Sequence, residues 1–210
     1  MIDSNNDLVE FEDQCPSCFK FCKTNMKPTE IPYFKSVIIM CTVCDFCGFK
    51  SCEVKSGSGI SDKGIRYVLK ITEPSDMSRD LLKSEDASFE IPELDFFVNS
   101  GTLGGKFTTI EGIIKNACEQ LENWCLSSFK NDLESQDKAN IMEDLIQKLI
   151  MIQNGKMFDV HIILDDPSGN SYIQNSYSPD NDPNMKIEFY ERDYYQNDLL
   201  GLNDIKTENY

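Results

Sequence analysis

Hydrophobic positions follow two different periods along the chain. Residues 66–71 alternate between polar and apolar, and residues 89–98 are rich in aromatic and branched side chains, with Pro92 as an interruption. Strand-like patterns return at residues 157–164 and 185–190. These segments predict a domain built mainly from β-strands.

Between these strands the hydrophobic period becomes helical. Apolar side chains recur every three or four positions in residues 109–126 and again in residues 138–154, where Ile141 to Ile152 share one side. Asn154-Gly155 supplies a stop signal after the second run. The polar residues 127–137 join the two runs, so the pattern predicts a helical hairpin with an exposed linker.

The first helical run carries two further signals. Thr108 and Glu111 have the spacing of a capping box, in which a hydroxyl and a carboxylate satisfy free backbone amides at the start of a helix. Cys118 and Cys125 lie on the apolar face of the same run. We interpret them as small buried hydrophobic residues, because free cysteine behaves in this way in protein cores.

A cysteine-rich segment near the start of the chain has the spacing of a zinc site. Cys15-Pro16-Ser17-Cys18 forms one knuckle, since a two-residue spacer lets both thiolates reach one ion. The second knuckle is either Cys41 with Cys44 or Cys44 with Cys47. Gly48 follows Cys47 and tolerates the positive φ that a knuckle requires. We therefore assign the second pair to Cys44 and Cys47, and leave Cys41 to the strand that precedes them.

Four protein thiolates close the coordination sphere of zinc, so the site is predicted to hold one structural Zn²⁺ ion. The nine cysteines are odd in number and occur without a secretory signal, which favours metal binding in a reducing compartment over disulfides. The predicted organisation is an acidic, flexible leader (1–13), a zinc ribbon (14–52) and a β-rich domain (53–210). The last contains the helical hairpin at about 109–154 and an acidic C-terminal segment.

The formal net charge is −16, from 20 basic and 36 acidic side chains. Such a field repels phosphate backbones and attracts a basic protein, which argues against nucleic-acid binding. We expect Asp180, Asp182, Glu188 and Glu191 to contribute to this attraction. No apolar run approaches the length of a membrane span. A monomer without membrane attachment is expected.

The sequence contains no recognisable catalytic constellation. The single histidine, His161, lies in a predicted strand and cannot provide the two histidines of a metal-dependent oxygenase site. No nucleophile elbow and no phosphate-binding glycine loop occurs. We therefore expect a binding module rather than an enzyme.

Several segments, taken in order along the chain, resemble the ZPR-type zinc-finger family. They are Cys15-Pro-x-Cys18, Ile31-Pro32-x-Phe34-Lys35, Cys44-x-x-Cys47-Gly48, Asp76-Met77-x-Arg79-Asp80-Leu81-Leu82-Lys83-Ser84, Gly104-Gly105-Lys106-Phe107-Thr108-Thr109-x-Glu111-Gly112 and Asp165-Asp166-Pro167-x-Gly169-Asn170-Ser171-Tyr172.

The resemblance implies a four-cysteine zinc ribbon followed by a double-stranded β-helix that carries a helical hairpin. It also implies binding of translation elongation factor 1-alpha, with a role in that factor's folding, in the cytoplasm and nucleus. A signalling adaptor for receptor tyrosine kinase tails and a nucleic-acid-binding zinc ribbon are the alternatives. Eukaryotic members usually carry two tandem modules, and this chain has one, most like the C-terminal module. Phe19 and Cys52 depart from the family pattern, which usually has a smaller residue and asparagine there.

Two groups of acidic and polar residues are candidates for partner contact. The segment from Asp165 to Tyr172 reads as a tight β-turn, and direct partner contact is the alternative. Within it the candidates are Asp165, Asp166, Gly169, Asn170 and Ser171, and Glu188 and Glu191 follow in the acidic C-terminal segment.

Overall fold

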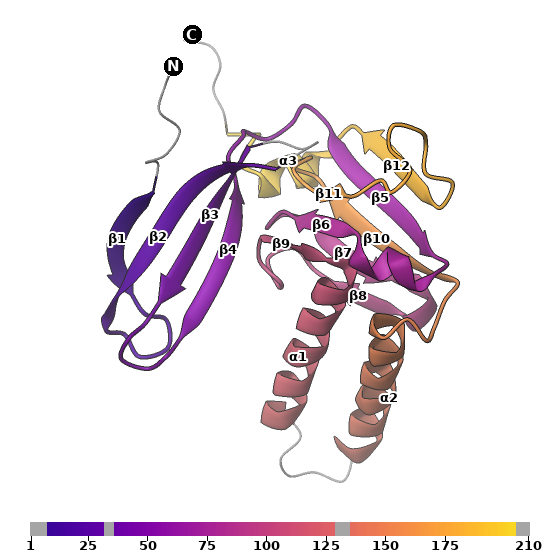
Figure 1. The fold of residues 1–210 in the computed structure, drawn as a ribbon, viewed down its shortest axis with the longest axis horizontal. Helices are drawn as coiled ribbons and strands as arrows, with labels where there is room; N and C mark the ends of the chain where they lie inside the picture. Colours follow the sequence, from indigo (N-terminus) through magenta and orange to yellow (C-terminus); the bar gives the residue numbers. More distant parts are fainter. Residues whose placement is uncertain (1–7, 32–35, 129–134, 205–210) are drawn as a thin grey trace.

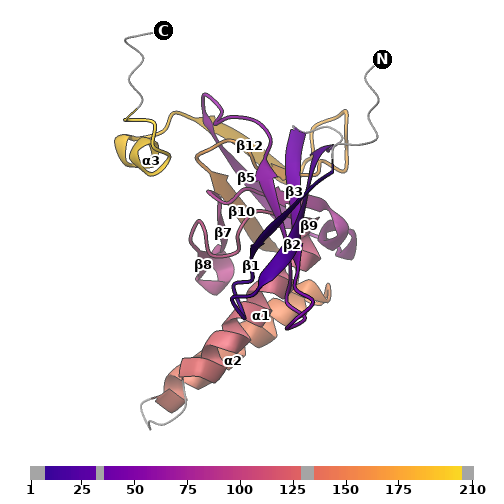
Figure 2. The ribbon, with the colours of Figure 1, turned by 90° about the vertical axis from the view of Figure 1, so that its left-hand side faces the viewer.

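The computed structural model describes residues 8–31, 36–128 and 135–204. These residues form a four-stranded sheet that extends as an arm, and a body of two sheets from which two long helices project (Figure 1). The arm and the helices extend to the same side of the body in both views of the ribbon (Figures 1 and 2).

The arm is the zinc ribbon. Each strand pairs antiparallel with the next one along the chain, which gives the order β1-β2-β3-β4. The two cysteine knuckles occupy the turns between β1 and β2 and between β3 and β4. The strands are β1 (Val9–Gln14), β2 (Phe21–Glu30), β3 (Ser36–Val43) and β4 (Lys50–Ser56).

The ribbon is longer than the predicted range 14–52. Strand β1 pairs with β2 from Val9 onward, opposite Met26, so the leader predicted over 1–13 is wrong for its last residues. The acidic side chains of this segment predicted a flexible leader. They are compatible with β1, because an edge strand tolerates charged side chains at exposed positions. Glu10, for example, accepts a hydrogen bond from the Lys23 ammonium across the pair at 2.8 Å. The first seven residues lie outside the described part of the chain.

The body contains eight strands in two sheets, the arrangement of a jelly roll, which confirms the predicted double-stranded β-helix. One sheet has the order β12-β5-β10-β7-β8, and the other β11-β6-β9. A 3-10 turn at Pro92–Leu94 separates β7 from β8, as Pro92 predicted. The strands are β5 (Gly64–Ile71), β6 (Asp80–Lys83), β7 (Ser88–Ile91), β8 (Phe96–Val98), β9 (Lys106–Thr109), β10 (Val160–Asp166), β11 (Tyr172–Ile173) and β12 (Met185–Tyr190).

Two long helices, α1 (Ile110–Ser128) and α2 (Ser135–Gln153), lie side by side and confirm the predicted hairpin (Figure 1). The linker predicted over 127–137 falls entirely in these helices or outside the described residues. A short helix, α3 (Tyr194–Leu199), was not predicted. Its capping box joins Asp193 and Gln196, whose spacing is the available sequence signal.

Helix α1 begins one residue later than the predicted cap requires. Strand β9 continues to Thr109, which pairs with Asp80. The Thr109 hydroxyl, rather than that of Thr108, accepts the backbone N–H of Gly112 at 3.1 Å. A Cβ on Gly112 would lie 2.1 Å from the Thr108 hydroxyl oxygen, so glycine is required there. Because α1 begins at Ile110, its third residue is Gly112 and not Glu111. The predicted capping box between Thr108 and Glu111 is therefore wrong.

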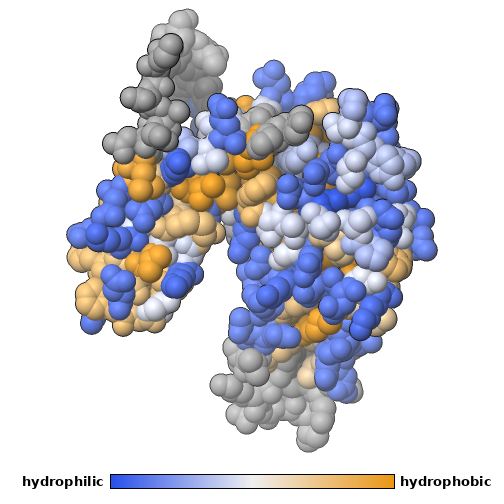
Figure 3. Space-filling view, viewed as in Figure 1, coloured by the Kyte–Doolittle hydropathy of each residue, from blue (hydrophilic) through white to orange (hydrophobic). Residues whose placement is uncertain are grey.

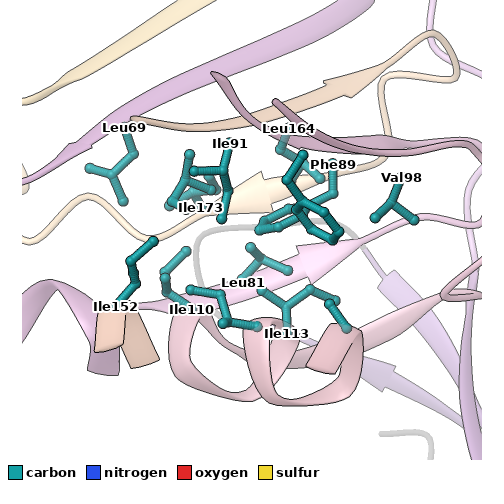
Figure 4. Close-up of a cluster of buried hydrophobic side chains, with 14 of the residues drawn as sticks. Leu69, Leu81, Phe89, Ile91, Val98, Ile110, Ile113, Ile152, Leu164 and Ile173 are labelled. Atoms are coloured by element: carbon teal, nitrogen blue, oxygen red, sulfur yellow. The ribbon is translucent and has the colours of Figure 1, made fainter. Parts of the chain in front are cut away.

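The main core lies between the five-stranded sheet and the hairpin. Figure 4 shows side chains of the sheets facing those of α1 and α2. Cys118 is buried there, as predicted, whereas Ile141 of α2 is 69% exposed, contrary to prediction. The fully buried members of this core are Leu69, Ile71, Leu81, Ala87, Phe89, Ile91, Ile110, Ile113, Ile114, Leu149, Ile152, Ile162, Leu164 and Ile173.

A second, smaller apolar cluster joins the ribbon to the body. Val37 and Val54 of the ribbon pack with Leu82 of β6. The backbone N–H of Val54 also donates to the carbonyl of Gly105 at 3.0 Å. A Cβ on Gly105 would lie 2.0 Å from the Val54 carbonyl oxygen. This close backbone approach seats one end of the ribbon on the body and leaves its knuckle end projecting.

Candidate metal centre

The first knuckle is a tight turn closed by two backbone hydrogen bonds. The Cys15 N–H donates to the Lys20 carbonyl at 2.9 Å, and the Phe19 N–H donates to the Cys15 carbonyl at 2.8 Å. This turn places Phe19 at φ 60°, which is uncommon for a residue with a side chain. The knuckle keeps its geometry although the residue after its second cysteine is not a glycine.

The second knuckle repeats this arrangement. The Cys44 N–H donates to the Phe49 carbonyl at 2.9 Å, and the Gly48 N–H donates to the Cys44 carbonyl at 2.9 Å. Gly48 has φ 75°, as its position after Cys47 predicted. The assignment of Cys41 to a strand is confirmed as well, since it belongs to β3.

The two turns bring Cys15, Cys18, Cys44 and Cys47 together at the tip of the ribbon. Their four sulfur atoms all lie within 4.8 Å of one another. Sulfur–sulfur distances across the knuckles are 3.6 Å for both Cys15–Cys47 and Cys18–Cys44. Zn–S bonds of about 2.3 Å in a tetrahedron place sulfur atoms about 3.8 Å apart, so the four residues fit zinc. These four thiolates would hold one structural ion and leave no position for a substrate.

The electrostatics of the cluster also suit a cation. The backbone N–H groups of Cys47 and Phe46 stabilise the Cys44 thiolate by more than burial destabilises it. They lower the pKa of this thiol to about 7. At Cys18 the amide of Lys20 favours the thiolate, but burial and the neighbouring sulfur atoms outweigh it and raise the pKa to about 12. Zinc binding therefore releases protons from crowded thiols, because only a cation compensates four adjacent thiolates.

Three other cysteines of the ribbon lie outside the ligand set. Cys22 is buried beside the cluster, and its sulfur donates to the Asp13 carbonyl at 3.5 Å. Cys41 and Cys52 face each other across β3 and β4 and are joined as a disulfide. The expectation that metal binding replaces disulfides is therefore wrong for this pair, because the register of the strands, which spacing does not reveal, places the two residues directly opposite.

Large aromatic side chains surround the metal centre and face solvent. Phe19, Phe21 and Phe46 are 73%, 63% and 65% exposed. The Lys20 ammonium lies 4.6 Å from the centre of the Phe46 ring, a cation–π contact. Figure 3 shows hydrophobic surface at this end of the ribbon. Sequence reasoning missed this aromatic tip, although the three residues occur within or next to the knuckles.

Most residues of the candidate turn at Asp165 to Tyr172 serve the fold. The Asp166 carboxylate is fully buried and accepts hydrogen bonds from five donors. One oxygen accepts the Ser168 N–H and hydroxyl at 2.8 and 2.7 Å. The other accepts the Asn170 N–H at 2.9 Å and the Ser84 and Ser171 hydroxyls at 2.8 and 2.6 Å. Because Asn170 and Ser171 are buried too, these three candidates are not placed to contact a partner.

The remaining members of that turn are also held in place. Gly169 has φ 69°, and a Cβ there would lie 2.5 Å from the Lys63 carbonyl oxygen, so glycine is a steric requirement. The Asp165 carboxylate accepts the Tyr190 hydroxyl at 2.6 Å and is partly exposed. Asp165 and Asp166 end β10 and Tyr172 begins β11, so the segment contains the turn that joins these two strands.

The acidic C-terminal candidates divide into surface and buried groups. Glu188 and Glu191 pair with neighbouring lysines at 2.5 and 2.8 Å and remain accessible. Asp182 is buried and forms an ion pair with the buried Arg79. Its expected role in attracting a partner is therefore wrong, because its charge is compensated inside the fold.

His161 is satisfied by a single neighbour. Its Nδ1 lies 2.5 Å from one carboxylate oxygen of Glu93, and its backbone N–H donates to the other at 2.9 Å. This arrangement agrees with a structural strand histidine. In the described residues, the cysteine cluster is the only group of three or more cysteine, histidine or acidic side chains placed to share a metal ion.

The fold and the site together define a zinc-ribbon protein with a jelly-roll body. Family models described as the ZPR1 zinc-finger domain and the ZPR1 jelly-roll domain match residues 7–62 and 75–202. The chain belongs to the ZPR1 family, as its resemblance predicted.

Similar proteins occur in eukaryotes and archaea. The chain is 48% identical over 208 residues to zinc finger protein ZPR1 of Mus musculus, covering 99% of this chain and 45% of that protein. It is 47% identical over 205 residues to the zinc finger chaperone zpr1 of Schizosaccharomyces pombe, covering 98% and 44%. An uncharacterized ZPR1-like protein of Methanocaldococcus jannaschii is 30% identical over 148 residues, which is 69% of each chain.

The chain thus spans less than half the length of the two eukaryotic relatives. None of the helices in the described residues combines the length and hydrophobicity that a bilayer-spanning helix requires.

Proposed function

We propose that this chain is a non-catalytic, protein-binding module that binds translation elongation factor 1-alpha and assists its folding or assembly, in the cytoplasm and nucleus. The observation that carries the proposal is the aromatic tip, formed by Phe19, Phe21 and Phe46. Exposed aromatic clusters of this kind are typical of protein-binding surfaces. The family resemblance supplies the identity of the partner, and the relative in Schizosaccharomyces pombe is named a chaperone.

The shape of the molecule is compatible with binding a protein between its two projecting parts. The ribbon and the hairpin project to the same side, and open space separates them in the space-filling view (Figure 3). Zinc binding keeps the tip in one conformation, so the aromatic side chains are ordered before the partner arrives. Such preorganisation reduces the entropy lost on binding.

The charge of the chain supports a basic partner over nucleic acid. The net charge is −16, and Asp180, Glu188 and Glu191 are accessible on the body. Surface charges of this kind raise the association rate with an oppositely charged protein and lose that effect as salt screens them.

The test is direct binding to purified elongation factor 1-alpha, measured by surface plasmon resonance at low salt in both nucleotide states. We expect association that slows with added salt, and a loss of at least about tenfold in affinity in the double variant Phe19→Ser/Phe46→Ser. Phe97→Ser provides the matched control, because Phe97 is 54% exposed on the body, away from the knuckles. Zinc content must stay at one ion in each variant.

Absence of association with the wild-type chain in either nucleotide state would refute the partner. Equal loss in the Phe97 control would refute the role of the aromatic tip.

A further inference from the structure

Three neighbouring ribbon strands place Asn25, Cys41 and Cys52 in one row. Cys41 lies directly opposite Asn25 of β2 on one side and opposite Cys52 of β4 on the other. The Cα atoms of the two cysteines are 4.2 Å apart. Side chains of directly paired residues leave the sheet on the same face, so the two sulfur atoms face each other.

This cysteine pair is chemically separate from the metal centre. Zinc has four ligands without it, and Cys52 is exposed while Cys41 is half-buried. An oxidant in solution therefore has access to the Cys52 sulfur. Cys22, by contrast, is buried and lies opposite Asp13 in the β1–β2 pair.

The pair nevertheless encloses half of the metal centre. The chain between Cys41 and Cys52 contains the second knuckle, with Cys44 and Cys47. A bond between the two sulfur atoms closes a short ring around this knuckle. Ring closure reduces the conformational freedom of the segment when it is not otherwise ordered. The bond therefore holds β3 and β4 in register at the base of the knuckle even without the metal.

Asn25, directly opposite Cys41, carries a buried hydrogen-bond acceptor beside the cysteine pair. Its side-chain oxygen Oδ1 has no donor among the described residues while the two cysteines are bonded to each other. A disulfide has no hydrogen to donate, whereas the thiol of a reduced Cys41 does. The two redox states therefore differ in kind: the oxidised state closes a ring around the knuckle, and the reduced state carries a thiol donor opposite a buried oxygen.

We propose that Cys41 and Cys52 form a reversible redox site, oxidised by glutathione disulfide, whose disulfide slows the loss of zinc from the second knuckle. The Cys52 thiolate attacks one sulfur of glutathione disulfide, which forms a mixed disulfide and releases one glutathione thiolate. The Cys41 thiolate then attacks the Cys52 sulfur and releases the second glutathione thiolate. The released thiolates take up the two protons lost by the cysteines, so two protein thiols are oxidised and one glutathione disulfide is reduced.

The first test locates the oxidation. The zinc-loaded chain is equilibrated in buffers of increasing glutathione disulfide to glutathione ratio, quenched, labelled with light and heavy alkylating reagents, and mapped by mass spectrometry. We expect Cys41 and Cys52 to become disulfide-linked together while the four zinc ligands stay reduced. Cys22→Ser should behave like wild type. Oxidation of the ligands before this pair, or a pair that stays reduced throughout, would overturn the proposal.

The second test measures zinc release into excess chelator with a chromogenic zinc indicator. The oxidised chain should release zinc at least about threefold more slowly than the reduced chain, as expected from ring closure around the knuckle. Cys52→Asn, with its zinc content verified, should release zinc at one rate before and after the same oxidation. Equal rates for the oxidised and reduced wild-type chains would contradict the coupling.

Discussion

The ribbon and the body both consist of antiparallel sheets, but they differ in what holds them together. In the body, sheets and helices enclose a continuous cluster of aliphatic and aromatic side chains. The ribbon's own cluster is centred on the buried sulfur atoms of Cys15, Cys22 and Cys44. Its other buried apolar side chains belong to the joint with the body, where Val37 and Val54 pack on Leu82.

This difference explains where hydrophobic surface is exposed. A four-stranded sheet of this size cannot bury a core of its own, and a metal ion replaces that core at the knuckle end. The aromatic residues of the knuckles are then not needed for packing. They remain at the surface as the aromatic tip, whereas the aromatic Phe89 of the body is fully buried. Metal binding thus supplies stability while leaving apolar side chains free for a partner.

The largest effect is expected from removal of the metal, which should destabilise the ribbon and not the body. Cys44→Ser should abolish zinc binding and unfold the ribbon, because structural zinc contributes roughly 10–16 kcal/mol of apparent binding free energy in small zinc domains. The body should keep its fold, since its core lies elsewhere. With the Cys41–Cys52 pair reduced, hydrogen–deuterium exchange should show loss of protection in β1 to β4 only. Cys22→Ser is the control and should retain one zinc ion, which elemental analysis will check.

The converse substitution destabilises the core of the body and does not alter the zinc knuckles. Ile114 is fully buried on α1, so Ile114→Asp should destabilise the body by about 5 kcal/mol or more through burial of a charge. Ile141→Asp is the matched control, because Ile141 is 69% exposed on α2 and should lose less than about 0.5 kcal/mol. Chemical denaturation followed by circular dichroism measures both. Similar losses in the two variants would contradict the described packing of the hairpin.

Lys83 provides a pH test of the body. Its side chain is fully buried and donates to the carbonyls of Ser84 and Gly104 at 3.0 and 3.4 Å. Burial lowers the pKa of its ammonium from 10.5 to about 8. Between pH 8 and pH 10 the unfolded chain keeps the proton that the folded Lys83 has lost, so this group should raise stability with pH by about 2 kcal/mol. Burial raises the pKa of the Cys118 thiol to about 11, and this group opposes part of the rise.

Above pH 10 the gain should end, because burial raises the pKa of Tyr67 and the unfolded chain then loses protons first. Urea denaturation of the zinc-saturated protein at pH 8 and pH 10 tests the rise. Lys83→Met should show a flatter profile, while Lys70→Met, at a partly exposed lysine, should keep the wild-type one. A wild-type profile that rises no more steeply than that of Lys83→Met would contradict the assignment.

The smallest effect concerns the start of α1. Thr109→Ala should cost about 1 kcal/mol, because the Thr109 hydroxyl accepts the Gly112 N–H. Thr108→Ala should cost less, since the Thr108 hydroxyl is not the cap. Thermal denaturation of the two variants ranks them. A larger loss of stability in Thr108→Ala than in Thr109→Ala would support Thr108 as the cap, as the sequence pattern predicted.

Local patterns predicted the parts of the molecule in which neighbours along the chain interact. The four clustered cysteines come from two knuckles, and within each knuckle the two cysteines lie three residues apart. The positive φ of Gly48 depends only on its own backbone. The hairpin follows from apolar residues that recur along one helix face. In both cases the deciding interactions lie within a few residues, so the sequence was sufficient.

Errors arose where a distant segment decided the outcome. The helix cap moved from Thr108 to Thr109 because β9 pairs with β6 as far as Asp80. Asp182 is buried because Arg79, more than a hundred residues earlier, needs a counter-charge. The acidic residues of β1 are ordered because β2 pairs with them.

The sequence by itself determined the four-cysteine cluster, the family and the helical hairpin, because these depend on short-range spacing and on resemblance along the whole chain. Only the tertiary structure decided that Asp166, Asn170 and Ser171 are buried and that the knuckle aromatics are exposed. It alone placed Cys41 opposite Cys52. Strand register and burial are properties of segments that meet in space, and the same residue types are compatible with either outcome until those segments pack.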